Sequence, residues 1–182
     1  MSFARSISYI FLLSIASCGN IIDDLSPSGE DKRASIEIGT EGFGVGQLAP
    51  DFTVSDSLGN EVTLSSALTG SKGIVFYFTM WCPYCDSHQE NMQSYVIPDF
   101  SPDIKFYLVD YVNDSVENCR ASQVSNGYGN APFTVLADTQ QKILTSFKAT
   151  MGTTIVIDSG GTVLMNEEYK KTKLLEILGG LQ

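Results

Sequence analysis

The stretch GIVFYFTMWCPYCDSHQENM, residues 73–92, decides the fold of this chain. Its residues 74–79 are all β-branched or aromatic, which is typical of a short buried strand. Cys82 and Cys85 follow at once, and polar residues from Asp86 onward open a helix. The unpaired N–H groups and positive dipole end of a helix stabilise a thiolate on the first cysteine, and the second lies one turn on. The pattern predicts that the two cysteines form a disulfide bond that is repeatedly made and broken.

The composition is that of one globular domain with appendages. The chain has 182 residues, 43% of them hydrophobic and 18% charged. Its net charge of −10 includes no basic stretch that could neutralise phosphates, which argues against nucleic acid as a partner. The four cysteines are too few and too unevenly spaced for a disulfide scaffold, so Cys18 and Cys119 need separate explanations.

Residues 1–17 have the pattern of an export signal. Arg5 gives a positive start, and the apolar segment 7–15 has about half of the ~20 residues that a membrane-spanning helix needs. The segment ends in Ile15-Ala16-Ser17-Cys18, which resembles the bacterial lipobox, in which the cysteine is lipidated and becomes the mature N-terminus. We therefore expect Cys18 to hold the protein on a lipid bilayer. A plain signal peptide or an uncleaved anchor with a bystander cysteine is the alternative.

Residues 20–46 have the composition of a linker. They are rich in Gly, Ser, Asp and Glu and show no sustained period. About 27 flexible residues reach roughly 30 Å, enough to hold a domain off a bilayer. We predict a lipidated N-terminus and flexible acidic linker over 18–46 and a folded domain over 47–182. An ordered cap on the domain within residues 34–45 is the alternative.

Strands alternate with helices in the rest of the chain. The expected strands are residues 61–64, 74–79, 104–112 and 133–136, followed by a hairpin of 155–157 and 162–165. Helices are expected after Cys85, from Asp114 or Ser115 to about Ser125, over 140–147, and over 174–181. This order predicts an α/β domain with a central mixed sheet and helices on both faces.

From about residue 46 to residue 182 the chain resembles the thioredoxin-like superfamily. Within it, the chain is most similar to the membrane-tethered TlpA/ResA type and to redoxin (AhpC/TSA-like) domains. The motifs that carry the resemblance are Ala49-Pro50-Asp51-Phe52, the Asp56 to Asn60 turn, Trp81-Cys82-Pro83-Tyr84-Cys85, Pro132 before a strand, and Thr153-Thr154-Ile155-Val156-Ile157-Asp158. The resemblance implies a thioredoxin-like fold with no cofactor and no metal.

The resemblance also implies roles for the two cysteines. Cys82 is the nucleophile that attacks a target disulfide, and Cys85 resolves the mixed disulfide. The neighbouring residues that support the site are Trp81, Pro83 and Tyr84. The alternatives are a static structural disulfide and a zinc site to which Cys119 and His88 supply the remaining ligands.

Two positions depart from the TlpA/ResA pattern. His88, the only histidine, stands three residues after Cys85, where that type usually has a glutamate. We interpret it as a proton acceptor or a stabiliser of a thiolate, with a solvent-exposed helix residue as the alternative. Gly152 precedes Thr153 where the family has a cis-proline. A cis peptide without proline costs about 3–4 kcal/mol, so we expect a trans bond and a reshaped loop.

The sequence leaves three functions to be compared. The first is a lipid-anchored thiol–disulfide oxidoreductase of the bacterial envelope, facing the periplasm or the cell exterior. It would reduce protein disulfides and be kept reduced by a membrane-embedded thiol reductant. The second is a peroxiredoxin-type thiol peroxidase, because Thr79 and Cys82 match a Thr-x-x-Cys motif, although Val75 replaces an expected proline. The third is a redox-inert binding or metal-carrier module. Cys119 is either a buried small hydrophobic residue or a third redox thiol.

Overall fold

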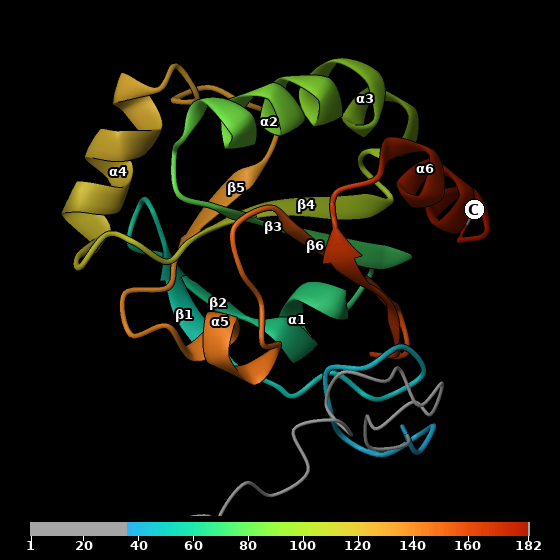
Figure 1. Cartoon of the computed structure of the whole chain (residues 1–182). Coiled ribbons are helices and arrows are strands. Elements are labelled where there is room, and N and C mark those ends of the chain that lie inside the picture. Colours follow the sequence, from blue (N-terminus) through green and yellow to red (C-terminus); the bar gives the residue numbers. More distant parts are fainter. Residues whose placement is uncertain (1–35, 182) are drawn as a thin grey trace, which may run out of the picture. The chain divides into compact units, whose positions relative to one another are not determined.

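A mixed β-sheet forms the centre of the structure (Figure 1). The computed structural model describes residues 36–181, and within them seven strands pair in the order β2-β1-β5-β4-β3-β6-β7. The β3–β4 and β4–β5 pairs are parallel, and the other pairs are antiparallel. The strands are β1 Thr53–Asp56, β2 Glu61–Thr63, β3 Gly73–Thr79, β4 Ile104–Asp110, β5 Thr134–Ala137, β6 Thr153–Asp158 and β7 Val163–Glu168.

Helices cover both faces of the sheet, which confirms the predicted α/β architecture. They are α1 Leu64–Leu68, α2 Pro83–Tyr95, α3 Ile97–Phe100, α4 Val116–Ser125, α5 Lys142–Ser146 and α6 Lys171–Gly179. Buried residues of α2, α3, α4 and α6 belong to one hydrophobic cluster, and those of α1 and α5 belong to a second cluster. Figure 1 shows α2 and α3 on one side of the strands and α1 and α5 on the other.

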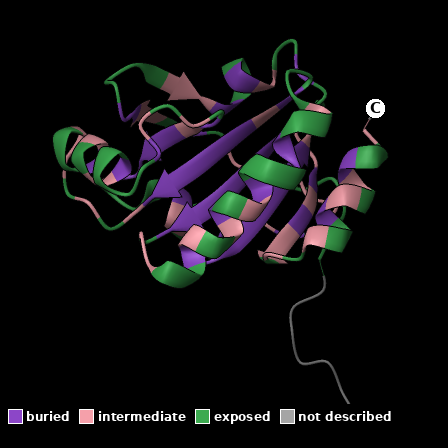
Figure 2. Ribbon diagram, turned by 90° about the horizontal axis from the view of Figure 1, so that it is seen from above, coloured by how far each residue is buried: buried purple, intermediate pink, exposed green. Residues whose placement is uncertain are grey.

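The central strand β3 is buried along its whole length, as the run of apolar residues predicted (Figure 2). Its side chains alternate between the two clusters: Val75 and Tyr77 face the α2 side, whereas Phe76 and Phe78 face the α1 and α5 side. A strand covered by helices on both faces needs apolar residues at every position, so it shows no polar alternation. This alternation places the Tyr77 ring under the helix that carries the cysteines.

Several strand ends differ from the sequence-based prediction, and two of these differences bear on the site. β4 ends at Asp110, two residues before the expected end at Val112, because the Asp110 carboxylate accepts hydrogen bonds from the backbone N–H groups of Val112 and Asn113 and turns the chain. β7 continues to Glu168, three residues beyond the expected end, because it pairs with β6 as far as Thr153. Both corrections bring a carboxylate to the end of the sheet that carries the cysteines.

Residues 36–46, which we expected to belong to a flexible linker, are hydrogen-bonded to the domain. The Gly46 N–H donates to Val163 O at 2.9 Å, and Asn166 Nδ2 donates to Phe43 O at 2.9 Å. The partners lie on β7, so this segment forms the ordered cap that the sequence left as the alternative. Cys18 and the export signal lie outside the described residues. No helix within residues 36–181 is both long and apolar enough to cross a bilayer.

Candidate active site

The two cysteines meet where β3 passes into α2. Cys82 is the N-cap of α2 and Pro83 takes the first helical position, where a missing N–H costs nothing. Cys82 Sγ accepts a hydrogen bond from the Cys85 backbone N–H at 3.3 Å and lies 3.0 Å from Cys85 Sγ. Both thiols are free. Cys82 is partly exposed and Cys85 is fully buried, so an incoming molecule meets Cys82 first.

Hydrogen bonds at the helix start favour a thiolate on Cys82. Partial burial acts to raise the pKa of Cys82, but the Cys85 thiol and the backbone N–H groups of Cys85 and Tyr84 outweigh it and hold the pKa below its ordinary value. These donors point at the sulfur from the first turn of the helix, where backbone N–H groups have no intrahelical partner. The environment therefore favours the thiolate form of Cys82.

Asp110 holds the residue before the nucleophile. Trp81 has a φ of 57°, in the left-handed region that an L-residue adopts at a cost. Its indole Nε1 donates to Asp110 Oδ2 at 2.8 Å and its backbone N–H donates to Thr79 Oγ1 at 3.1 Å. Asp110 is paired in register with Thr79 across the parallel strands and is fully buried. The sequence analysis missed Asp110, although a carboxylate ending the strand parallel to β3 was a usable signal.

The loop before β6 brings Met151 to the nucleophile. Met151 Sδ lies 3.5 Å from Cys82 Sγ. The Met151–Gly152 bond is trans, as expected, since the one cis peptide in the described part of the chain is Ser101–Pro102. Gly152 has a φ of 80°, its N–H donates to Phe78 O at 2.9 Å, and its carbonyl accepts from the Tyr169 N–H at 3.0 Å. Hydrogen bonds to Phe78 on β3 and to Tyr169, the residue after β7, thus fix the loop.

Thr153 closes this loop on itself. Thr153 Oγ1 accepts a hydrogen bond from the Thr150 N–H at 2.9 Å, and the Thr153 side chain is buried. The contact ties the two ends of the segment that carries Met151 and Gly152. Thr153 therefore supports the shape of the loop through its own side chain.

His88 is enclosed by aromatic side chains rather than exposed. Its Nδ1 lies 3.0 Å from the Tyr77 hydroxyl, and its ring centroid lies 4.4 Å from that of Tyr84 and 4.5 Å from that of Tyr169. Burial lowers the pKa of His88 below its ordinary value, although the nearby charge of Glu168 acts in the opposite direction. His88 is therefore mainly neutral at pH 7, and its Nδ1 faces a hydroxyl. Tyr77 and Tyr169 are site neighbours that the sequence analysis did not identify.

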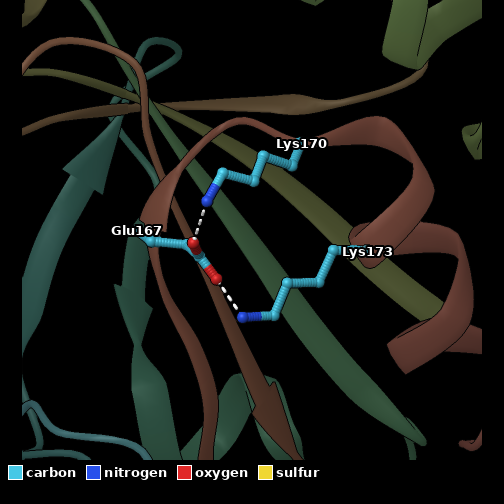
Figure 3. Close-up of polar contacts among 3 residues, drawn as sticks. All are labelled: Glu167, Lys170 and Lys173. Atoms are coloured by element: carbon cyan, nitrogen blue, oxygen red, sulfur yellow. Dashed lines mark hydrogen bonds and ion pairs between the residues drawn. The ribbon is translucent and has the colours of Figure 1, made fainter.

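The end of β7 supports this aromatic group through two glutamates that point in different directions. Glu168 accepts a hydrogen bond from the Tyr84 hydroxyl at 2.7 Å. Glu167 pairs with Lys170 and Lys173, which come from the start of α6 (Figure 3). Between strand and helix, Tyr169 donates its hydroxyl to Asn91 Oδ1 at 2.8 Å. The Glu167 contacts thus fix the turn that presents Tyr169 to His88.

Cys119 does not join the other two cysteines. It lies on α4, is fully buried, and burial together with the neighbouring Asp110 raises its pKa well above the ordinary value. A thiol in this state is a poor nucleophile, which supports the interpretation as a small hydrophobic residue. Among residues 36–181, no three His, Cys, Asp or Glu side chains are grouped closely enough to hold a metal ion. The Cys119 and His88 ligands of the zinc alternative are accordingly not brought together with the cysteine pair.

Comparison with known proteins identifies the family and the fold. A model of the AhpC/TSA family matches residues 45–165. A search of the curated proteins gives no match. One similar solved structure is DsbF from MTB, with 22% identity and a TM-score of 0.59 over 72% of this chain and 95% of that chain. A second is the peroxidoxin BcpB from Mycobacterium tuberculosis, with 20% identity and a TM-score of 0.62 over 76% of this chain and 97% of that chain. A third is the mitochondrial 2-Cys peroxiredoxin from Plasmodium falciparum, with 19% identity and a TM-score of 0.59 over 75% of this chain and 93% of that chain. These likenesses confirm a thioredoxin-like fold.

The environment of Cys82 predicts a pH-dependent reactivity that can be measured by alkylation. In the reduced protein, the iodoacetamide reaction of Cys82 should reach half its maximal rate at a pH below 9.0, the ordinary thiol value, because hydrogen bonds stabilise the thiolate. Cys85 and Cys119 should react far more slowly because both are fully buried. A Cys85→Ala variant removes one donor and should move the midpoint upward. Equal rates for all three thiols, with an unshifted midpoint, would contradict the assignment of Cys82 as nucleophile.

The conformation of Gly152 predicts that proline is not tolerated there. Proline requires a φ near −65°, whereas Gly152 has a φ of 80°. Proline also has no N–H, so Gly152→Pro loses the hydrogen bond to Phe78 O, and this loss alone should lower the unfolding free energy by about 1–3 kcal/mol. Gly152→Ala is the matched control: it keeps the N–H, its Cβ has room beside Tyr84, and it should cost about 1–2 kcal/mol for the left-handed backbone. Urea denaturation measures both. A Gly152→Pro variant as stable as the wild type would mean that the loop adopts another conformation.

Proposed function

Because the chain belongs to the AhpC/TSA family, with a redox function at the family level, we propose that it is a thiol–disulfide oxidoreductase that uses Cys82 and Cys85. The observation that carries the proposal is the 3.0 Å separation of the two sulfur atoms, with the exposed thiol at the helix N-cap and the buried thiol behind it. Two thiols in contact within one turn of helix can form a disulfide with only a small movement.

The proposed reaction proceeds in two exchange steps. The Cys82 thiolate attacks a substrate disulfide, a bond forms between Cys82 Sγ and one substrate sulfur, and the other substrate sulfur leaves as a thiolate. The Cys85 thiolate then attacks Cys82 Sγ, the Cys82–Cys85 bond forms, and the second substrate sulfur leaves. The dithiol loses two electrons and the substrate disulfide gains them. The second step is intramolecular, so the held geometry favours it over attack by solvent thiols.

The surroundings of Cys82 support a polypeptide as the substrate. The exposed side chains of Met80, Tyr84 and Met151 lie within a few residues of Cys82 or in contact with it. Apolar groups around a reactive thiol favour binding of a chain segment next to its disulfide. A reducing enzyme must be returned to the dithiol form, and a membrane-embedded thiol reductant is the partner that we propose for this step.

A thiol peroxidase is the second candidate, and the family match favours it. In that reaction the Cys82 thiolate would attack the outer oxygen of a hydroperoxide, the O–O bond would break, and an alcohol or water would leave. The resulting sulfenic acid would condense with the Cys85 thiol, forming the disulfide and releasing water. Thr79, three residues before Cys82, has its hydroxyl oxygen occupied by hydrogen bonds from the Trp81 N–H and Gln89 Nε2. Arg120 is held on α4 by its bond to Gln123. Thr79 and Arg120 thus form these hydrogen bonds with residues other than Cys82, and the geometry of the thiol pair favours the first candidate.

We also propose that the protein acts in the bacterial cell envelope, held on a membrane through lipidated Cys18. The supports are the apolar segment 7–15 and the Ile15-Ala16-Ser17-Cys18 sequence. Dithiol chemistry of this kind suits an exported domain, where substrate proteins contain disulfides. The domain would face the periplasm or the cell exterior.

The two candidate reactions are distinguished by paired assays on the same variants. The wild type should accelerate insulin disulfide reduction by dithiothreitol, Cys82→Ser should abolish the acceleration, and Cys119→Ala should retain it. Cys85→Ala should accumulate a mixed disulfide with insulin on Cys82, detected by mass spectrometry, because no resolving thiol remains. Consumption of hydrogen peroxide by the wild type, at a rate well above its insulin reduction and dependent on Cys82, would instead establish the peroxidase.

The anchor is tested by fractionating a bacterial host that produces the full chain. Cys18→Ala should move the protein from the membrane fraction to the soluble fraction, since a lipidated cysteine is the proposed attachment. Cys119→Ala, made in the same host, should leave the protein in the membrane fraction. A Cys18→Ala protein that stays membrane-bound and has wild-type mass would contradict the lipid anchor.

A further inference from the structure

Three sulfur atoms from two separate parts of the chain lie close together at the cysteine pair. Cys82 Sγ is 3.0 Å from Cys85 Sγ and 3.5 Å from Met151 Sδ. The cysteines stand at the start of α2, whereas Met151 stands in the loop before β6. An apolar contact for a substrate needs only a hydrocarbon side chain, so the disulfide chemistry does not account for the sulfur of Met151.

The spacing of the three atoms fits a single metal ion with little movement. An ion bonded to three sulfur atoms at about 2.3 Å, the length of a zinc–thiolate bond, holds them about 4 Å apart in a trigonal arrangement. The two separations from Cys82 Sγ are shorter than this by about 1 Å or less. The Met151 side chain has three rotatable bonds and can adjust its position. Its backbone is held, because the Gly152 N–H donates to Phe78 O.

The exposure of the three side chains gives an ion a way in. Met151 is 37% exposed and Cys82 is partly exposed, whereas Cys85 is fully buried. An ion that enters from solvent therefore meets Met151 and Cys82 first and Cys85 last. Both thiols are free in this structure, and a thiol loses its proton when it binds a metal ion. The reduced pair is thus the form that can bind.

The donor set identifies the ion. Thiolate and thioether sulfur atoms are soft ligands that select Cu(I), zinc or iron–sulfur clusters. Iron–sulfur clusters take cysteine thiolates at all positions in most proteins, and Zn²⁺ almost always takes four ligands from Cys, His, Asp and Glu. Within residues 36–181, no third side chain of those four types joins the cysteine pair. Cu(I) accepts fewer sulfur ligands than Zn²⁺ does, so two thiolates and one thioether suit Cu(I).

We propose that Cys82, Cys85 and Met151 form a binding site for one Cu(I) ion. Two thiolate sulfur atoms from the start of α2 and one thioether sulfur atom from the loop before β6 bind the ion. The inference goes beyond the proposed disulfide chemistry and does not depend on it, because the thiols here act as ligands and exchange no electrons. Bound Cu(I) occupies both thiols, so it closes the pair to disulfide substrates.

The test is a competition for Cu(I) between the reduced full-length protein and the coloured chelator bicinchoninate, in the absence of oxygen. The wild type should withdraw one equivalent of Cu(I) from the chelator. Met151→Leu keeps the size and apolar character of the side chain and removes the sulfur. It should lower the affinity at least about tenfold, and Cys82→Ser and Cys85→Ser should lower it further, because even residues behind the ligands are worth about 10–100-fold in metal affinity.

Met80→Leu is the matched control, because Met80 is also an exposed methionine and lies two residues before Cys82 on the link between β3 and α2. It should retain the wild-type affinity. X-ray absorption of the copper-loaded proteins counts the ligands: three sulfur atoms are expected in the wild type and in Met80→Leu, and two in Met151→Leu. Equal losses of affinity in Met80→Leu and Met151→Leu would contradict the assignment of Met151 as the third ligand.

Three results would overturn the site. They are a wild type that leaves Cu(I) on the chelator, copper bound by only two sulfur atoms in the wild type, and tighter binding of Zn²⁺ than of Cu(I) in the corresponding competition. If Met151→Leu melts at a lower temperature than the wild type, the ligand count of the wild type decides. A protein that reduces insulin but leaves Cu(I) on the chelator loses the copper site and keeps the proposed function, and the reverse pattern does the opposite.

Discussion

The sulfur of Cys82 occupies the position that a serine or aspartate oxygen takes at many helix starts, and most of the site depends on this placement. A side chain at an N-cap receives backbone N–H groups that no helical carbonyl can satisfy, and here the receiving atom is a thiol. The placement requires a helix that begins directly after a strand. It therefore requires β3 to be fixed in the middle of the sheet, with both of its faces covered. Burial of the strand and reactivity of the thiol are thus two consequences of one chain path.

The short link between β3 and α2 is strained, and neighbouring elements hold it. Trp81 has a left-handed backbone, and the Asp110 carboxylate at the end of the parallel strand holds its indole group. The same carboxylate accepts hydrogen bonds from the residues that follow it, so the turn after β4 and the turn before Cys82 share one buried acceptor. On the other side, Gly152 connects β3 and Tyr169, the residue after β7, through its N–H and its carbonyl. Cys82 is consequently positioned by residues from three separate parts of the chain.

The site also differs in chemistry on its two sides. Sulfur and apolar groups, including Met151, adjoin the exposed face of Cys82. Behind the pair, aromatic rings with polar tips enclose His88, and each of the hydroxyl groups of Tyr77, Tyr84 and Tyr169 has a hydrogen-bond partner. The exposed side of the pair is therefore apolar, whereas the interior side carries hydrogen-bonding groups.

The sequence by itself determined most of the secondary-structure elements and the position of Cys82 and Cys85 at a helix start, since these depend on local patterns. The continuous apolar run identified β3, and the Cys-x-x-Cys spacing at a helix start indicated the thiol chemistry, because both signals lie within twenty consecutive residues. Replacement of the cis-proline by Gly152 also predicted a trans bond from local energetics alone. The sequence left the ordering of residues 36–46 open, because the hydrogen bonds that attach Gly46 and Phe43 to β7 join residues more than a hundred positions apart. Only the tertiary structure decided that Asp110 holds Trp81, that Met151 contacts Cys82, and that the Tyr77 hydroxyl contacts His88 Nδ1. Each of these contacts depends on which strands are neighbours and which face a side chain takes, and strand order and register are set by packing of the whole sheet.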